Sequence, residues 1–162
     1  LWENPLTRFL METWDIIAVR RGRVDGRALK ACLDALETGA LLGIAPEGTR
    51  SKTGHLTRGH RGAAMLAVRS GVPVYPVAQC GFRDIGTNLP KLRRTPVTIR
   101  VGRPYTVRVP GGAQPTASDL RRIADEMMYQ IAVLLPAPLR GVYADMSKLT
   151  TDYLEFPDSE GR

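Results

Sequence analysis

Residues 41–51 read LLGIAPEGTRS, in which a short apolar run passes directly into a polar loop. The run 41–45 has the length and composition of a buried strand, and Pro46 ends it because proline cannot donate to a strand ladder. Gly48 allows the backbone to turn and to approach a ligand closely. Polar loops at the carboxyl ends of strands are where open α/β sheets bind their ligands. This stretch therefore predicts an α/β fold with a binding loop.

The segments around this loop alternate between helical and strand patterns. In chain order they are a helix entry at 4–14, a strand at 16–19, a helix from Asp25 to Gly39, a strand at 41–45, a helix at 63–69, strands at 72–78, 96–101 and 105–109, and a helix that begins at Thr116 or Ser118 and ends at Pro136. This order predicts an α/β domain with a central mixed β-sheet flanked by helices. Pro73 and Pro76 interrupt one strand, so at least one of its edges must be free there.

Length and composition indicate one folded domain with an uneven charge. The chain has 162 residues, of which 43% are hydrophobic and 24% charged, and this excludes a wholly disordered chain. Residues 136–162 hold three basic and five acidic residues, a balance of −2, so the net charge of +7 leaves +9 on residues 1–135. A basic body favours an anionic partner, whether nucleic acid, anionic lipid or a phosphorylated substrate. We expect residues 1–135 to form the domain and residues 136–162 a polar, acidic tail that is irregular or loosely docked.

The polar side chains of the loop suit the binding of a phosphate group. Arg50 offers a planar fork of donors that matches a phosphate in a two-point contact. Thr49 and Ser51 can donate hydroxyl protons, and Glu47 can accept from a hydroxyl or hold the arginine in place. On the residues alone, an ordinary polar turn with a solvated arginine stays an equal alternative, because charged loop residues are usually just solvated.

A nucleotide-binding P-loop is rejected for the same stretch. Gly43 and Gly48 have the spacing of that motif, but Thr49 stands where its essential lysine belongs.

Cysteine and histidine give no pattern of a metal or redox site. Cys32 and Cys80 are only two, so we interpret them as reduced, buried thiols. His55 and His60 lie in a polar segment without a spaced carboxylate, which favours solvated or helix-capping roles over catalysis. No metal and no cofactor are expected.

Three blocks of sequence resemble the glycerolipid acyltransferase family. Residues 46–51, reached from an apolar run, are similar to its FPEGTRS block, with Ala45 in place of the phenylalanine. Residues 72–77, VPVYPV, resemble its later proline-containing strand. Residues 17–21, IAVRR, resemble its second block, an apolar strand that ends in arginine. The blocks occur in the family's order, and the resemblance covers about residues 1–110.

The resemblance implies an activity, its partners and a location. It implies transfer of an acyl group from acyl-CoA or acyl carrier protein to lysophosphatidic acid, which gives phosphatidic acid in phospholipid biosynthesis. It implies a peripheral protein at the cytoplasmic face of the cell membrane, with the membrane surface as a partner and nucleic acid not one.

The resemblance also implies roles for individual residues. Arg50 would hold the phosphate of the acceptor, Gly48 and Thr49 would shape the pocket, and Glu47 would position the acceptor. Arg21 is similar to an arginine assigned to the same acceptor. The resemblance further implies that Pro73 and Pro76 either help the acyl donor to fit or have a structural role.

The family's reaction uses a histidine and an aspartate spaced His-x4-Asp, in which the histidine is the general base and the aspartate orients it. Here the fifth residue after His55 is His60, and the fifth after His60 is Met65. We therefore expect an N-terminally truncated part of such an enzyme that is inactive alone.

Two alternatives to an enzyme follow from the basic body. One is a non-catalytic module that binds anionic lipids or phosphate. The other, a nucleic-acid-binding domain, is disfavoured because the chain has no recognised nucleic-acid motif and no basic stripe along one helix.

Overall fold

The computed structural model describes residues 17, 26–49, 51, 53–82 and 85–157. The chain divides into two compact units, residues 1–42 and residues 43–162. The helix entry predicted at 4–14 and the strand predicted at 16–19 lie outside the described residues, apart from Ile17.

In the first unit, the helix predicted between Asp25 and Gly39 is confirmed as α2 (Gly26–Glu37). An ion pair at i,i+4 joins Lys30 Nζ to Asp34 Oδ2 at 2.7 Å on its exposed surface. Gly39 follows the helix with φ 83°, the left-handed conformation in which glycine commonly ends a helix. The predicted N-cap, Asp25, lies outside the described residues.

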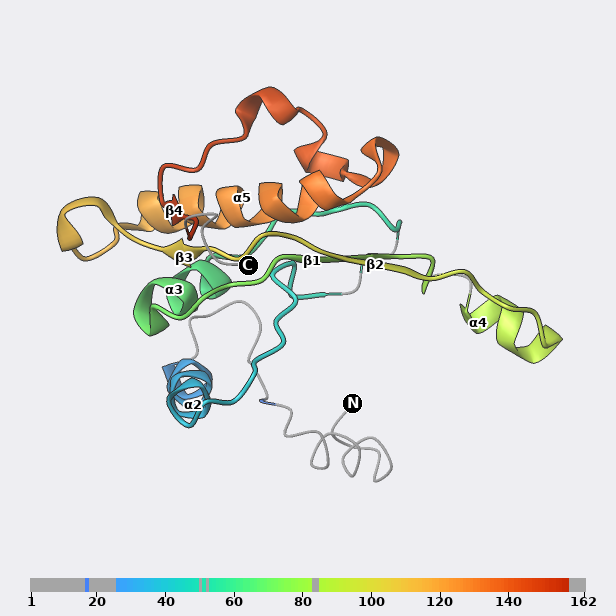
Figure 1. Ribbon diagram of the computed structural model, residues 1–162, viewed down its shortest axis with the longest axis horizontal. Helices are drawn as coiled ribbons and strands as arrows, with labels where there is room; N and C mark the ends of the chain where they lie inside the picture. Colours follow the sequence, from blue (N-terminus) through green and yellow to red (C-terminus); the bar gives the residue numbers. More distant parts are fainter. Residues whose placement is uncertain (1–16, 18–25, 50, 52, 83–84, 158–162) are drawn as a thin grey trace. The chain divides into compact units, whose positions relative to one another are not determined.

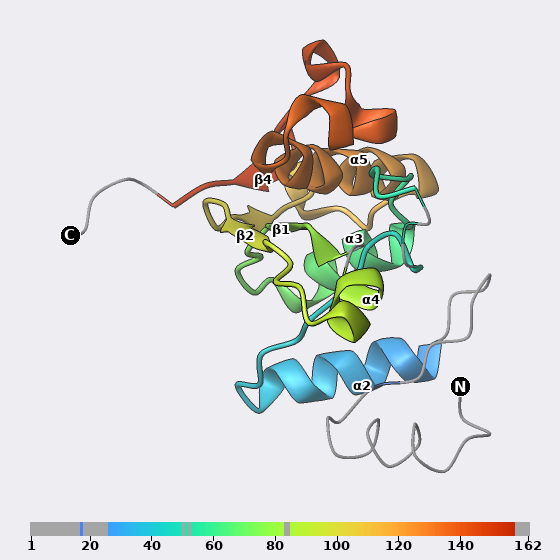
Figure 2. The same ribbon diagram turned by 90° about the vertical axis from the view of Figure 1, so that its right-hand side faces the viewer.

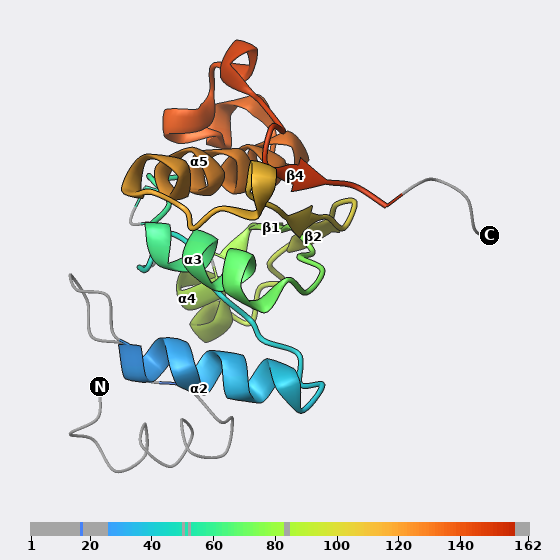
Figure 3. The same ribbon diagram turned by 90° about the vertical axis from the view of Figure 1, so that its left-hand side faces the viewer.

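The second unit contains the remaining helices and strands of the described chain. They are α3 (Arg61–Ser70), β1 (Val77–Cys80), α4 (Ile85–Asn88), β2 (Thr98–Val101), β3 (Thr106–Val107), α5 (Ala117–Leu134) and β4 (Leu154–Glu155), with short 3-10 turns at η2 (Leu89–Lys91), η3 (Pro110–Gly112), η4 (Ala137–Leu139), η5 (Gly141–Tyr143) and η6 (Met146–Lys148). Figure 1 shows α5 running alongside the strands. Figures 2 and 3 show, from opposite sides, that α3, β1 and β2 lie on one side of α5 and the C-terminal turns on the other.

The strands pair in two antiparallel ladders. β1 pairs with β2, so that Val77 lies opposite Val101, and β3 pairs with β4, so that Val107 lies opposite Leu154. An isolated antiparallel bridge joins Val74 to Tyr105 between them. The predicted α/β class is confirmed, but the described strands alone do not assemble a central mixed sheet.

Two predicted strands differ from the structure. Residues 41–45 form no strand, and Leu41 is 96% exposed, because no described strand lies beside this run to pair with it. The strand predicted at 72–78 begins only at Val77. Prolines cannot donate to a ladder, and the two in this segment confine its earlier pairing to the bridge at Val74.

Helix α5 is capped by Thr116, one of the two predicted N-caps. Thr116 Oγ1 accepts from the backbone N–H of Asp119 at 3.2 Å, and Asp119 Oδ2 accepts from the backbone N–H of Thr116 at 2.8 Å, which together form a capping box. The helix ends just before Pro136, as predicted. None of the described helices combines the length and the apolar character needed to cross a bilayer.

Helix α5 buries two faces rather than one. One face packs against α3, β3 and β4, and its buried residues are Leu120, Ile123, Ala124 and Met127. The second face packs against the loop before α3 and the C-terminal turns, and its buried residues are Met128, Tyr129 and Ala132. The first face follows the helical spacing of its apolar residues, whereas the second depends on a covering segment that this spacing does not reveal.

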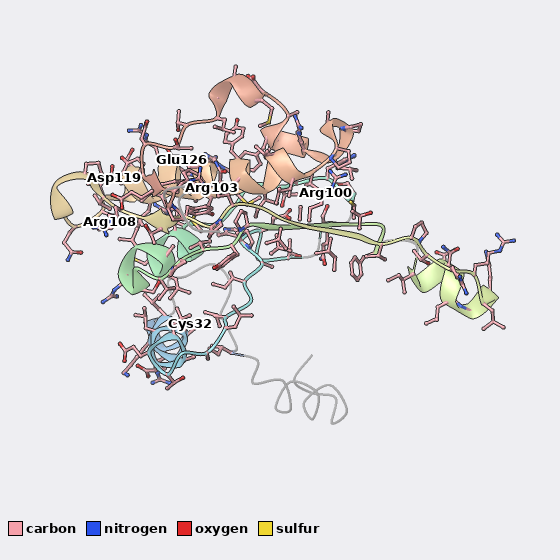
Figure 4. The ribbon with its side chains drawn as sticks, viewed as in Figure 1. Cys32, Arg100, Arg103, Arg108, Asp119 and Glu126 are labelled. Carbon is pink, nitrogen blue, oxygen red and sulfur yellow. The ribbon has the colours of Figure 1, made fainter. Side chains whose placement is uncertain are left out.

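The expectation of loose docking for the tail is wrong for residues 136–157, the C-terminal segment. Glu126, labelled on α5 in Figure 4, is only 2% exposed. Its carboxylate accepts from Thr150 Oγ1 at 2.7 Å and from the backbone N–H groups of Asp152 and Tyr153, each at 3.0 Å. These three hydrogen bonds hold the segment in place. If they were broken, the buried carboxylate and its donors would be left unpaired, which costs folding free energy.

Candidate functional site

The loop that follows residues 41–45 is folded by its own polar side chains. Glu47 Oε2 accepts two hydrogen bonds from Thr57, from the backbone N–H at 2.8 Å and from Oγ1 at 2.6 Å. Ten residues separate the two partners, so the carboxylate closes the loop on itself. Glu47 therefore has an observed role in shaping the loop, and its other oxygen accepts nothing from the described residues.

Gly48 makes the turn of the loop. Its φ is 65°, a conformation that L side chains rarely adopt, and its N–H donates to Ala45 O at 3.0 Å. A Cβ at Gly48 would lie 2.9 Å from His60 Cδ2, so the imidazole lies directly against the turn. His60 is fixed there because its N–H donates to Pro46 O at 2.8 Å. The sequence placed His60 in a polar segment but did not indicate this contact.

The tip of the loop depends on a serine. Ser51 Oγ donates to His55 O at 2.7 Å and accepts from Gly54 N at 3.0 Å, so its hydroxyl is used within the loop. Thr49 is exposed, with no hydrogen bond from its hydroxyl to the described residues. The two predicted phosphate contacts, Arg50 and Arg21, lie outside the described residues, so their roles stay predictions.

The end of the loop is anchored to α5 and the C-terminal segment through Gly59. Its N–H donates to Tyr143 Oη at 3.1 Å, and its carbonyl accepts from Arg121 Nη1 at 2.7 Å. Arg121 also pairs with Asp125, and Asp125 accepts from Tyr143 Oη at 2.9 Å. Burial, helped by the hydrogen bond to Asp125, raises the pKa of Tyr143 to about 12, so the phenol stays protonated and keeps donating at neutral pH.

Packing at two points reinforces this anchor. A Cβ on Gly59 would lie 2.5 Å from Met128 Cγ, so only glycine allows this close approach to α5. Leu56 N donates to Leu139 O at 3.0 Å, and Val142 N donates to Leu56 O at 3.3 Å. The anchoring residues lie more than 60 positions along the chain from the loop, and no sequence signal pointed to them.

The prolines predicted for donor fit or structure, Pro73 and Pro76, lie where the chain enters β1. Pro76 is buried, its carbonyl accepts from Gly102 N at 2.8 Å, and its Cγ would lie 2.9 Å from a Cβ on Gly102. Pro73 is exposed. The structure thus gives Pro76 a packing role. A role of the two prolines in fitting the acyl donor stays a prediction.

A pocket of about 560 Å³ lies beside the anchored end of the loop. Its lining includes three cationic side chains, from Arg58, Arg122 and Lys148. Two of these are already paired, Arg122 with an aspartate at 2.8 Å and Lys148 with another at 3.3 Å. This pairing leaves Arg58 as the lining cation without an ion pair to the described residues.

The described residues include two thiols but no cluster of metal-ligating side chains. Within the described ranges, no three His, Cys, Asp or Glu side chains lie together as metal ligands do. Cys32 and Cys80 are free and half-buried, and burial raises the pKa of Cys32. An ordinary thiol of this kind is a poor nucleophile.

Comparison with known proteins agrees with the motif. Residues 1–79 match the family model described as Acyltransferase, and this range contains the whole turn 46–51 and both prolines. Two chloroplastic 1-acyl-sn-glycerol-3-phosphate acyltransferases, from Brassica napus and Arabidopsis thaliana, are each 35% identical over 85 residues. That region covers 50% of this chain and 24% and 23% of those relatives, so the chain matches about a quarter of their length. No solved structure matches.

Residues 1–79, just under half of the chain, therefore match the acyltransferase family that the resemblance predicted. The residues that anchor the loop, on α5 and in the C-terminal segment, follow the matched range.

Proposed function

We propose that the whole protein transfers an acyl group from acyl-CoA or acyl carrier protein to lysophosphatidic acid, which gives phosphatidic acid. The observation that carries the proposal is the turn at residues 46–49, which lies inside the family match and is held in shape by Gly48 and by the bond between Glu47 and Thr57. A turn fixed before the ligand arrives loses less entropy on binding than a mobile loop.

In this proposal the turn binds the phosphate of the acceptor. Arg50 makes the two-point contact, Arg21 supplies a second cation, and the exposed hydroxyl of Thr49 donates to a remaining oxygen. Gly48 lets the backbone come close to the headgroup. Glu47 acts mainly through the shape of the turn, because one of its oxygens is already bound to Thr57.

The proton transfer of this reaction needs a general base. A histidine takes the proton of the acceptor hydroxyl, the oxygen attacks the carbonyl carbon of the thioester, and the thiol leaves. His55 and His60 lack the His-x4-Asp spacing. We propose that the base is supplied by residues outside this sequence. These 162 residues alone would then not catalyse acyl transfer.

The proposed location is the cytoplasmic face of the cell membrane, with peripheral attachment. The acceptor is a membrane lipid and the donor a soluble carrier, so the reaction belongs at a surface. The charge of +9 on residues 1–135 suits an anionic membrane.

Arg50→Ala in the complete protein tests the role of the turn. We expect kcat/KM for lysophosphatidic acid to fall by about 1.5–3 kcal/mol in transition-state stabilisation, or roughly 10- to 150-fold, because a charge-assisted contact is lost. Arg69→Ala, which removes an exposed arginine from α3, is the matched control and should have little effect. An unchanged kcat/KM for Arg50→Ala would remove this arginine from the site, and turnover by the 162-residue chain would contradict the proposed absence of its base.

A second candidate function is a non-catalytic module that binds anionic lipid or phosphate through the same turn. It is favoured by the lack of a His-x4-Asp pair within these residues. This candidate predicts that the complete protein binds the acceptor without turnover. The proposed enzyme predicts both binding of the acceptor and its turnover.

A further inference from the structure

The connection between β1 and β2 is longer than a hairpin needs. Its residues 85–97, the hairpin tip, contain α4 and η2 and lie beyond the ends of the two strands, away from α5 (Figure 1). The tip has hydrogen bonds of its own, from Asn88 Nδ2 to Thr95 Oγ1 and from Arg93 N to Asn88 O, each at 3.0 Å. It is therefore an ordered projection rather than an arbitrary loop.

Large apolar side chains of the hairpin tip face outward. Leu89 is 69% exposed and Leu92 is 94% exposed. Leu92 also has φ 50° and is the only residue other than glycine with a positive φ in the described chain. This conformation disfavours L side chains, and asparagine or glycine would adopt it more readily. The sequence therefore has a leucine at a site where both backbone conformation and exposure to water disfavour it, which indicates a role in contact with something apolar.

The hairpin tip is also strongly cationic. Lys91, Arg93 and Arg94 make no ion pair with any described residue. Residues 85–118 include no aspartate or glutamate at all, so nothing within this stretch offsets the charge. The other three cations of the stretch are held by partners on α5 and the C-terminal segment, and they are Arg100, Arg103 and Arg108 (Figure 4).

We propose that the hairpin tip inserts into the surface of an anionic phospholipid bilayer. Leu89 and Leu92 enter the boundary between headgroups and acyl chains, while Lys91, Arg93 and Arg94 bind lipid phosphates. A bilayer accepts any projecting apolar side chain, whereas a protein partner needs a matching pocket, and this favours lipid over an acidic protein as the occupant. The proposal rests on the proposed membrane-surface function and adds the part of the fold that makes the contact.

Co-sedimentation of the full chain with vesicles tests the proposal. Vesicles of phosphatidylcholine alone are compared with vesicles that also contain phosphatidylglycerol. Each cation near an anionic surface strengthens binding about fivefold, so we expect the triple variant Lys91→Gln, Arg93→Gln, Arg94→Gln to lose on the order of 100-fold in binding to the anionic vesicles. Added salt should shrink this difference.

A single substitution separates membrane contact from a structural role. We expect Leu92→Asn to keep or raise the melting temperature, because asparagine tolerates positive φ, yet to weaken vesicle binding about five- to tenfold. The controls are Val142→Ser, which removes another exposed apolar side chain, and Arg69→Gln, which removes another exposed cation. Both controls should bind the vesicles as the unchanged chain does.

The proposal is overturned if Leu92→Asn and the triple variant bind anionic vesicles normally, or if the controls lose as much binding as they do. It is also overturned if the variants no longer bind an acidic carrier protein but still bind the vesicles. Vesicle binding requires no turnover, and acyl transfer can be assayed with dispersed short-chain lysophosphatidic acid. The absence of acyl transfer would therefore not affect the vesicle-binding test. A failure to bind vesicles would likewise not contradict the proposed acyl transfer.

Discussion

Among single residues, Glu47 has the clearest structural role, because its carboxylate joins two parts of one loop. Both hydrogen bonds to its Oε2 come from Thr57, and the hydroxyl bond is 2.6 Å long. The bonds fix the turn at Gly48, against which His60 also packs. A residue of the binding motif thus contributes by holding the backbone that presents Thr49 to solvent.

Two variants in the complete protein separate this positioning role from direct contact with the acceptor. Glu47→Gln and Thr57→Val each weaken the same bond, so we expect each to lower kcat/KM for the acceptor by about 1–2 kcal/mol, roughly 5- to 30-fold. The double variant should be little worse than Glu47→Gln alone, because Thr57→Val removes only the hydroxyl bond, which Glu47→Gln already weakens together with the backbone bond. If Thr57→Val is silent while Glu47→Gln is not, the hydroxyl bond does not position the turn, and Glu47 acts through the backbone bond or on the substrate directly.

Residue-level reasoning succeeded where the signal was local. The turn at Gly48 and the cap at Thr116 follow from the conformational and hydrogen-bonding preferences of glycine and threonine. Glu126 was not foreseen, since a glutamate within a helical pattern normally faces water. Its partners, Thr150, Asp152 and Tyr153, are at least 24 positions further along, and no short-range pattern reveals them.

At the scale of elements, strong periodicity predicted helices better than apolar runs predicted strands. Helices α2, α3 and α5 lie where the sequence placed them, because their spacing and their glycine or proline ends are internal to each element. A strand needs a neighbour, and residues 41–45 have none among the described strands. For the same reason the direction of pairing between β1 and β2 could not be derived from the order of the elements.

The capping box of α5 makes its stability depend on pH. Hydrogen bonds from Thr116, first its side chain and then its backbone, together with one from Tyr153 Oη, hold the pKa of Asp119 below its usual value. A carboxyl whose pKa is lower in the folded state stabilises the fold above its unfolded pKa of about 3.9, and this contribution is lost as the pH falls through the folded value. Asp119 therefore favours the folded state at neutral pH and not in strong acid.

We expect Asp119→Asn to lower the melting temperature at pH 7, and the deficit to shrink as the pH falls below about 4. Melting curves of both chains across this range measure it. Glu155→Gln, which removes an exposed ion pair with Arg108, is the control and should change stability less. A deficit that stays constant down to the lowest pH would mean that the charge of Asp119 does not support the cap.

At the scale of the molecule, residues 136–157 complete the core of the second unit rather than trail from it. Tyr143 is buried with residues of α5, and Tyr153 and Leu154 are buried against its other face. The segment also carries the phenol that holds Gly59 at the end of the binding loop. The matched family range, residues 1–79, thus contains the loop but not the scaffold that fixes it.

Deletion of residues 136–162 tests this dependence and the division predicted between residues 135 and 136. The deletion exposes the second face of α5 and removes the three donors to Glu126, so we expect a loss of about 3–5 kcal/mol or more from a fold that has only 5–15 kcal/mol in total. Urea unfolding measures it. Glu126→Ala keeps the segment but removes its acceptor, and Thr150→Val removes one donor, so stability should fall in the order Thr150→Val, Glu126→Ala, deletion. A deleted chain that unfolds at the same urea concentration would show that residues 1–135 fold without the segment, and Glu126→Ala should then also be silent.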